Sequence, residues 1–185
     1  SLYHDVGKLH APNWFIENQF GSKNPHDEID DPLKSAKVLQ AHVDEGLKFA
    51  RKNRLPKPIA NFIPEHQGTL KMGYFLNKAE EKKLNFNEND FRYKGPIPQS
   101  KETAILMLAD GCEAALRAMD INASDSEALE TISKIVNSRK TDGQLNDSNL
   151  SKGEIFLIKK SFLNVWKRIR HRRIQYPTTK NNTFS

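Results

Sequence analysis

Apolar positions along the chain recur at the spacing of amphipathic helices and never alternate long enough to indicate a strand. Between residues 33 and 51 they repeat near a period of 3.6, and His42 falls within this apolar stripe. A second stripe follows Ser100, which is typical of a helix N-cap, and Asp110 lies at its border. Further helices are expected at residues 58–66, 72–84, 124–138 and 152–173. The pattern therefore predicts an all-α bundle.

The segments between these helices are rich in turn-forming residues. Residues 9–32 are expected to form a long loop, and residues 85–99 a linker. Residues 1–5 look like the middle of a helix without a capping pattern, so we expect a bundle truncated at its N-terminus. We assign residues 1–176 to one domain that lacks its first helix or helices, and residues 177–185 to a polar tail.

Composition narrows the class of protein. The 185 residues are 37% hydrophobic and 28% charged, with a mean hydropathy of −0.71, which is typical of a soluble globular domain. The single cysteine, Cys112, excludes an internal disulfide and favours a reducing compartment. The net charge of +6 is concentrated at residues 167–173, which we interpret as a solvated helix face. No motif indicates binding of duplex nucleic acid.

Candidate metal ligands are distributed over several predicted helices. His4 and Asp5 are adjacent, and an imidazole beside a carboxylate suits divalent manganese, iron or zinc. His42, His66 and Asp110 add one ligand type from each of three other helices, and helical bundles build metal sites in this way. Taken singly, such residues are more often packing histidines and solvated carboxylates.

The remaining histidines lack this setting. His10 and His26 fall in the long loop and His171 in the basic segment, so we expect all three on the surface.

Several short segments also carry a family resemblance. Residues 2–8, LYHDVGK, resemble the HD-x-G-K signature of HD-superfamily phosphohydrolases. Further segments resemble the bacterial seven-transmembrane HD proteins that hydrolyse cyclic di-AMP: residues 15–19, 24–27, 65–68, 91–96, 99–102 and 109–115. The resemblance implies an HD-domain helical bundle that binds two divalent metal ions, manganese or iron, and cleaves the cyclic dinucleotide to pApA.

The resemblance also implies roles for individual residues. His4, Asp5 and Asp110 would hold one ion, while Asp5, His42 and His66 would hold the other. Asp5 would then bridge the two ions, which together lower the pKa of a bound water.

Other residues are expected to contact the substrate. Lys8, one turn after the His-Asp pair, is a candidate catalytic residue and phosphate ligand, alongside the catalytic Asp5. Arg92, Lys101 and Tyr93 are further substrate-binding candidates. Trp14 and Phe15 could stack on adenine or plug the core.

The sequence departs from the family pattern at two points. Gln67 stands where the family commonly has a second histidine, and a further histidine ligand lies upstream of this chain's first residue. We therefore expect a metal site that is partly filled or empty. The resemblance further implies a cytoplasmic domain of an inner (plasma) membrane protein, whose membrane segments precede this chain.

Three alternatives to a cyclic di-AMP phosphodiesterase stay open. The same ions could serve an HD phosphohydrolase that acts on another nucleotide, such as ppGpp or a dNTP. Gln67 invites the interpretation of a degenerate HD domain that binds a nucleotide without cleaving it. A purely structural helical module would leave the spaced ligands without a reason.

Overall fold

The computed structural model describes residues 2–19 and 24–173 of the chain, and this part is helical. Within it, β structure is confined to an isolated bridge between Lys71 and Arg92. The helices are α1 (Pro25–Ile29), α2 (Pro32–Lys52), α3 (Lys57–Ala60), α4 (Phe62–Glu65), α5 (Gly73–Glu81), α6 (Lys101–Arg117), α7 (Asp125–Thr141) and α8 (Lys152–Arg173). Four 3₁₀ helices accompany them: η1 (Val6–His10), η2 (Pro12–Trp14), η3 (Ile16–Asn18) and η4 (Glu88–Phe91). The predicted all-α class is confirmed.

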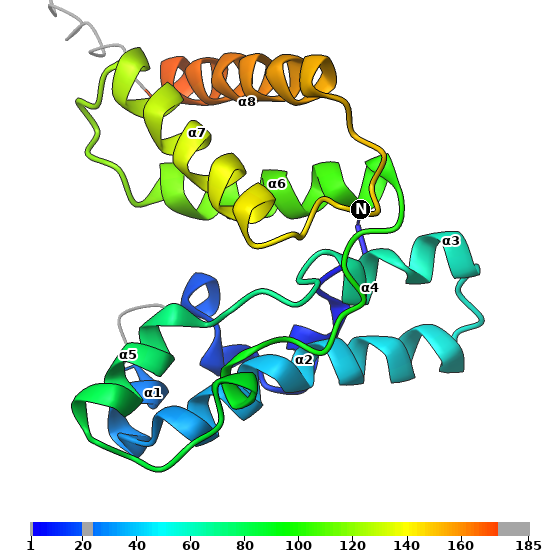
Figure 1. Ribbon diagram of the computed structural model, residues 1–185, viewed down its shortest axis with the longest axis vertical. Coiled ribbons are helices and arrows are strands. Elements are labelled where there is room, and N and C mark those ends of the chain that lie inside the picture. The colour runs from blue at the N-terminus through cyan, green and yellow to red at the C-terminus, as the bar shows by residue number, and fades with distance from the viewer. Residues whose placement is uncertain (1, 20–23, 174–185) are drawn as a thin grey trace, which may run out of the picture.

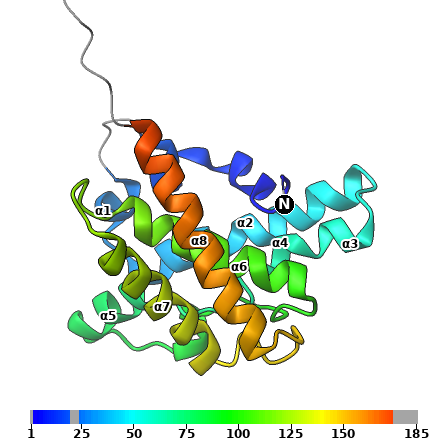
Figure 2. The same cartoon turned by 90° about the horizontal axis from the view of Figure 1, so that it is seen from above.

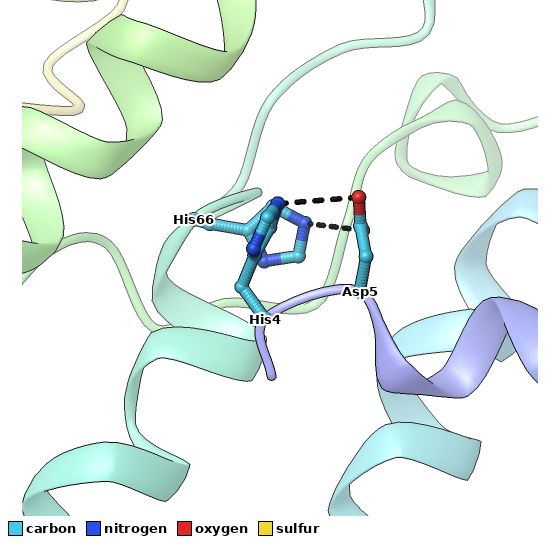
Figure 3. Close-up of side chains that lie close together, drawn as sticks. All are labelled: His4, Asp5 and His66. Atoms are coloured by element: carbon cyan, nitrogen blue, oxygen red, sulfur yellow. Dashed lines mark ion pairs between the residues drawn. The ribbon is translucent and has the colours of Figure 1, made fainter. Parts of the chain in front are cut away.

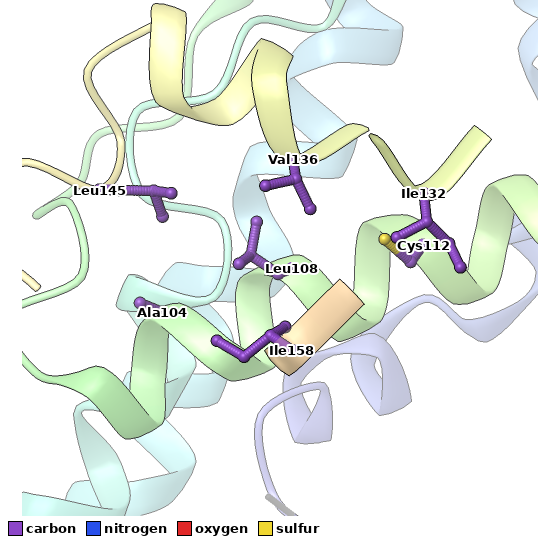
Figure 4. Packing of buried hydrophobic residues seen from close by; sticks show 7 residues of the cluster. All are labelled: Ala104, Leu108, Cys112, Ile132, Val136, Leu145 and Ile158. Atoms are coloured by element: carbon purple, nitrogen blue, oxygen red, sulfur yellow. The ribbon is translucent and has the colours of Figure 1, made fainter. Parts of the chain in front are cut away.

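The helices form two layers, which Figures 1 and 2 show from two directions. The N-terminal layer contains η1 and α1 to α5, and the C-terminal layer contains α6, α7 and α8. Each layer has its own hydrophobic cluster. The cluster of the N-terminal layer consists of Ala36, Met72, Phe75, Leu76, Ala79 and Phe91. That of the C-terminal layer consists of Ala104, Leu108, Cys112, Ile132, Val136, Leu145 and Ile158 (Figure 4).

Polar contacts join the two layers. The buried Glu65 carboxylate at the end of α4 accepts hydrogen bonds from the Thr103 hydroxyl at 2.6 Å and from the Gln99 amide at 2.9 Å. The Gln144 side chain bonds to Thr69 through its carbonyl and its amide. We call this set of contacts the polar seam, and the candidate site lies beside it.

The long predicted helices are close to those observed. The helix expected at residues 33–51 is α2, and the one expected at 152–173 is α8. Ser100 caps α6 as predicted, because its side chain accepts a hydrogen bond from the Thr103 amide.

The helix expected at residues 58–66 is instead two short helices, α3 and α4, that meet at Asn61. Pro64 has no N–H to donate to the Ala60 carbonyl, and its ring would clash with that carbonyl in a continuous helix. The Glu65 amide bonds to the Asn61 carbonyl at 3.1 Å and starts a new hydrogen-bond ladder that ends at His66. The expected kink is therefore a break.

The segment expected as a loop at residues 9–32 holds two 3₁₀ helices and α1. The expectation that His26 is a surface residue is wrong, because it is only 8% exposed. Its ring lies between those of Trp14 and Phe75, and its Nε2 lies 3.0 Å from the Trp14 carbonyl oxygen. Asn24 sets this position by capping α1 at the His26 amide. Aromatic packing therefore outweighs the local turn signals.

Other expectations keep different standings. His10 is exposed as expected, while the His171 side chain and the tail at residues 177–185 lie outside the described residues. Along residues 2–19 and 24–173, none of the helices has the length and apolar character needed to cross a bilayer. Placement in the cytoplasm stays a prediction.

Candidate metal centre

Two glycines bring the first segment of the chain against α2. A Cβ atom on Gly7 would overlap the His42 carbonyl oxygen and would lie 2.6 Å from the Gly46 backbone nitrogen. Only hydrogen at position 7 allows η1 to approach α2 this closely. The approach places His4 and Asp5, at the start of η1, next to the buried His42.

Asp5 lies at the centre of the candidate site. Its Oδ2 is 3.2 Å from His4 Nε2, and its Oδ1 is 3.3 Å from His66 Nε2 and 3.6 Å from His42 Nε2. His4 Nε2 also lies 3.8 Å from Asp110 Oδ1 on α6. Figure 3 shows His4 and His66 converging on the Asp5 carboxylate, and ligand atoms of these three residues lie within 4.8 Å of one another. The five predicted metal ligands are therefore brought together.

Backbone carbonyls fix the orientation of two of the imidazoles. His42 Nδ1 lies 2.5 Å from the Leu39 carbonyl oxygen, and His66 Nδ1 lies 2.7 Å from that of Ile63. Each Nδ1 therefore carries the proton, and each Nε2 presents a lone pair toward Asp5. The two Nε2 atoms are 3.5 Å apart. Two neutral imidazoles that face each other in this way have no proton to share, but both can ligate a cation.

The Asp5 carboxylate supports the same interpretation. Its Oδ1 is buried and has no hydrogen-bond donor, although it is the atom closest to the two lone-pair nitrogens. A buried anionic oxygen without a partner is costly. A divalent cation would satisfy Oδ1 and both nitrogens, so the residues present fit a metal. Nitrogen and carboxylate donors together suit manganese, iron or zinc.

Protonation states also favour metal binding. Burial raises the pKa of Asp5, but the hydrogen bond from His4 and the Lys8 ammonium lower it by more, so the carboxyl stays ionised. Burial and the neighbouring His66 lower the pKa of His42 to about 4, which keeps this imidazole neutral at pH 7. The pKa of Asp110 is lowered because the hydrogen bond with His4 outweighs the opposing effect of burial. These groups therefore need not lose protons to bind a cation at neutral pH.

Lys8 lies at the edge of the cluster. Its Nζ is 2.8 Å from Asp5 Oδ2 and 2.5 Å from Glu17 Oε1, and it also lies over the Phe15 ring. Burial alone would lower the pKa of Lys8, but the carboxylates of Asp5 and Glu17 raise it. The predicted phosphate ligand is therefore a charged group beside the metal ligands.

The other predicted substrate contacts are placed differently. Arg92 donates to Asp142 at 3.2 Å and to the Thr69 carbonyl, and Lys101 donates to Glu154 at 2.6 Å. These partners assign both side chains to the polar seam and the surface, so we retain neither in the proposal below.

Two aromatic candidates pack against the site. The Tyr93 ring lies 6.0 Å from that of His42, and burial together with Asp5 and Asp110 raises the pKa of its hydroxyl. Phe15 is buried with its ring 5.6 Å from the same imidazole. Both residues therefore support the ligands, and neither presents an open face for adenine.

Some functional residues carry little signal in the sequence. Glu17 was only part of a motif, and nothing local indicates that it meets Lys8 nine residues earlier. The carbonyls that orient the imidazoles belong to Leu39 and Ile63, whose side chains are ordinary apolar ones. Both carbonyls lie three residues before the histidine, a spacing that only the helical backbone makes meaningful.

The fold and ligand cluster are those of a known class, since the HD domain family model matches residues 1–115. The chain therefore belongs to the HD-domain family. It is similar to the cyclic-di-AMP phosphodiesterase PgpH of Listeria monocytogenes serotype 1/2a (strain 10403S), at 36% identity over 97% of the chain. It is also similar to PgpH of Bacillus subtilis (strain 168), at 38% identity over 96% of the chain. The uncharacterized protein slr0104 of Synechocystis sp. is 47% identical over 96% of the chain.

The chain spans about a quarter of the length of these relatives, with 22% to 25% of each covered. Solved structures agree with the family assignment. The crystal structure of the L. monocytogenes PgpH HD domain in complex with cyclic-di-AMP matches 90% of this chain and 77% of its own, with a TM-score of 0.86 and 35% identity. The structure of the same domain without that ligand in its description gives a TM-score of 0.84 at 34% identity. The expected HD-domain bundle is confirmed.

Proposed function

We propose that this chain is a metal-dependent phosphodiesterase that hydrolyses cyclic di-AMP to pApA. The observation that carries the proposal is the convergence of two Nε2 lone pairs on a buried, unpartnered oxygen of Asp5. The similarity to two cyclic-di-AMP phosphodiesterases, and to an HD domain solved with that ligand, supports the choice of substrate. We further propose two divalent ions, manganese or iron, that share Asp5.

The chemistry divides between the ions and the protein. When bound, divalent ions supply an activated water and stabilise negative charge on the phosphorus. The chain's own residues hold and orient: backbone carbonyls fix the imidazoles of His42 and His66, while His4 and Asp110 close the opposite side of Asp5. The Lys8 ammonium lies where it can pair with a substrate phosphate oxygen.

The decisive experiment compares substrates and a single variant. The chain, freed of metal and reloaded with manganese, is assayed by chromatography with cyclic di-AMP, cyclic di-GMP, ppGpp and dNTPs. We expect pApA from cyclic di-AMP, no more than slow turnover of the others, and loss of activity with a chelator. Asp5→Asn should lower the rate by at least about 100-fold, because the metal contribution is worth several kcal/mol.

The controls separate a failed site from a failed fold. Asp5→Asn should keep the helical circular dichroism of the unaltered chain, and Glu113→Gln on the exposed face of α6 should leave the rate unchanged. Metal analysis by mass spectrometry then counts ions per chain. An active Asp5→Asn protein would remove the bridging role, and preferred turnover of ppGpp or a dNTP would reassign the substrate. Tight binding of cyclic di-AMP without pApA would establish the non-hydrolytic alternative that Gln67 suggests.

A further inference from the structure

The ammonium of Lys8 is shared between two carboxylates. Its Nζ lies 2.8 Å from Asp5 Oδ2 and 2.5 Å from Glu17 Oε1. The three side chains are 21%, 27% and 32% exposed, so water screens these charges only in part. The Phe15 ring lies 5.1 Å from the same ammonium and covers one side of it.

This arrangement creates a competition at Asp5. A divalent ion at the candidate metal centre needs the carboxylate that the Lys8 ammonium also contacts. A lysine is charged at neutral pH, so it repels a nearby ion and occupies a ligand oxygen. Glu17, on η3, offers the ammonium a second anionic partner within reach of the same side chain.

We propose that Glu17 is a positioning residue that holds the Lys8 ammonium away from Asp5 when Asp5 binds a metal ion. The inference rests on the proposed metal centre and adds to it a residue that does not touch the ion. In the metal-bound protein, Lys8 pairs with Glu17 and keeps its remaining donors for the phosphate of the substrate. Without Glu17, the ammonium has Asp5 as its only nearby carboxylate among the contacts described above, and metal binding must break that pair.

The test is a double-mutant cycle on manganese affinity, which is measured by titration calorimetry without substrate. Glu17→Gln should weaken manganese binding by about five- to tenfold, since it removes a partly screened charge and leaves Lys8 on Asp5. Lys8→Met should strengthen binding. In the Lys8→Met background, Glu17→Gln should cost no more than about twofold, because only its direct attraction for the ion remains.

Matched variants separate positioning from general charge and from folding. Glu17→Asp keeps the negative charge and should keep most of the affinity. Glu45→Gln removes a comparable carboxylate, which pairs with Lys48 at 2.6 Å on α2, and should leave the affinity unchanged. Thermal melts of each metal-free variant should agree with that of the unaltered chain, because Glu17 is exposed.

The outcomes distinguish the two proposals. Manganese binding to the unaltered chain with equal affinity in Glu17→Gln would overturn the role of Glu17 and leave the metal centre intact. An equal loss in both backgrounds would likewise overturn it, since Lys8 would then be uninvolved. Absence of manganese binding to the unaltered chain would overturn the metal centre and the role of Glu17 together.

Discussion

At the scale of single residues, the smallest side chain in the site is the least replaceable. Gly7 lets η1 lie against α2, and a methyl group there would overlap the His42 carbonyl oxygen. We expect Gly7→Ala to destabilise the protein by about 2 kcal/mol or more, because two backbone segments must separate. It should also abolish manganese binding, because His4 and Asp5 move with η1.

Gly73→Ala is the matched control for this prediction. A Cβ atom there has no neighbour within 4 Å, so stability should stay the same or rise by less than about 1 kcal/mol. Chemical denaturation and metal titration of both variants provide the measurements. A Gly7→Ala protein as stable as Gly73→Ala would show that the contact is less tight than described.

The sequence revealed the ligand types but not their orientation. His42 could be placed on a buried stripe from periodicity alone, and the family resemblance assigned His4, Asp5, His66 and Asp110. The tautomers of the imidazoles and the unpartnered Asp5 oxygen depend on contacts between separate elements, which no local pattern encodes.

At the scale of elements, long helices were predictable and short ones were not. The stripe that defines α2 spans six turns, so periodicity accumulates enough signal. The four-residue helices α3 and α4 are shorter than one period of any stripe, and their boundary depends on the missing N–H of Pro64. His26 was misplaced for a related reason, since its burial arises from aromatic rings at positions 14 and 75.

The link between α4 and α6 gives a prediction at this scale. Glu65 is 3% exposed and accepts two hydrogen bonds from the start of α6, next in sequence to the ligand His66. Glu65→Ala leaves the Gln99 amide and the Thr103 hydroxyl without their acceptor. We expect a loss of about 2 to 4 kcal/mol in the free energy of unfolding.

Denaturant titration measures this loss, and Glu80→Ala on the exposed face of α5 is its control, with an expected change below about 0.5 kcal/mol. Thr103→Val should reproduce part of the effect and be less than additive with Glu65→Ala, because the two side chains share one bond. Full additivity would contradict the proposed link.

At the scale of the whole molecule, the ligands are divided between two layers with separate cores. Asp5, His42 and His66 belong to the N-terminal layer and Asp110 to the C-terminal one. Without a metal ion, His42 is a buried neutral imidazole whose pKa is lowered from 6.5 to about 4. Global unfolding exposes it to water and restores its ordinary pKa.

The sign of the pH dependence follows. As pH falls below 6.5, the unfolded chain takes up the proton before the folded one, so stability is lost between about pH 6.5 and 4. The loss attributable to His42 is on the order of 3 kcal/mol, while the carboxyls of Asp5 and Asp110, whose pKa values lie below the ordinary 3.8, act at lower pH.

Urea titrations of metal-free protein at several pH values measure this slope. His42→Gln should flatten it, and replacement of the exposed His10 by Gln should leave it unchanged. Equal slopes in the unaltered chain and in His42→Gln would falsify the assignment to His42.

The imidazoles of His42 and His66 are held by main-chain oxygens rather than by carboxylate side chains. No point substitution can delete a peptide carbonyl, so the identities of residues 39 and 63 can drift without loosening the rings. The weak point moves instead to the register of the helix. A single-residue insertion between positions 39 and 42 would rotate the ring by about 100° away from Asp5 while leaving every ligand in the sequence. Homologues with intact ligand residues but altered spacing here should therefore be regarded as inactive.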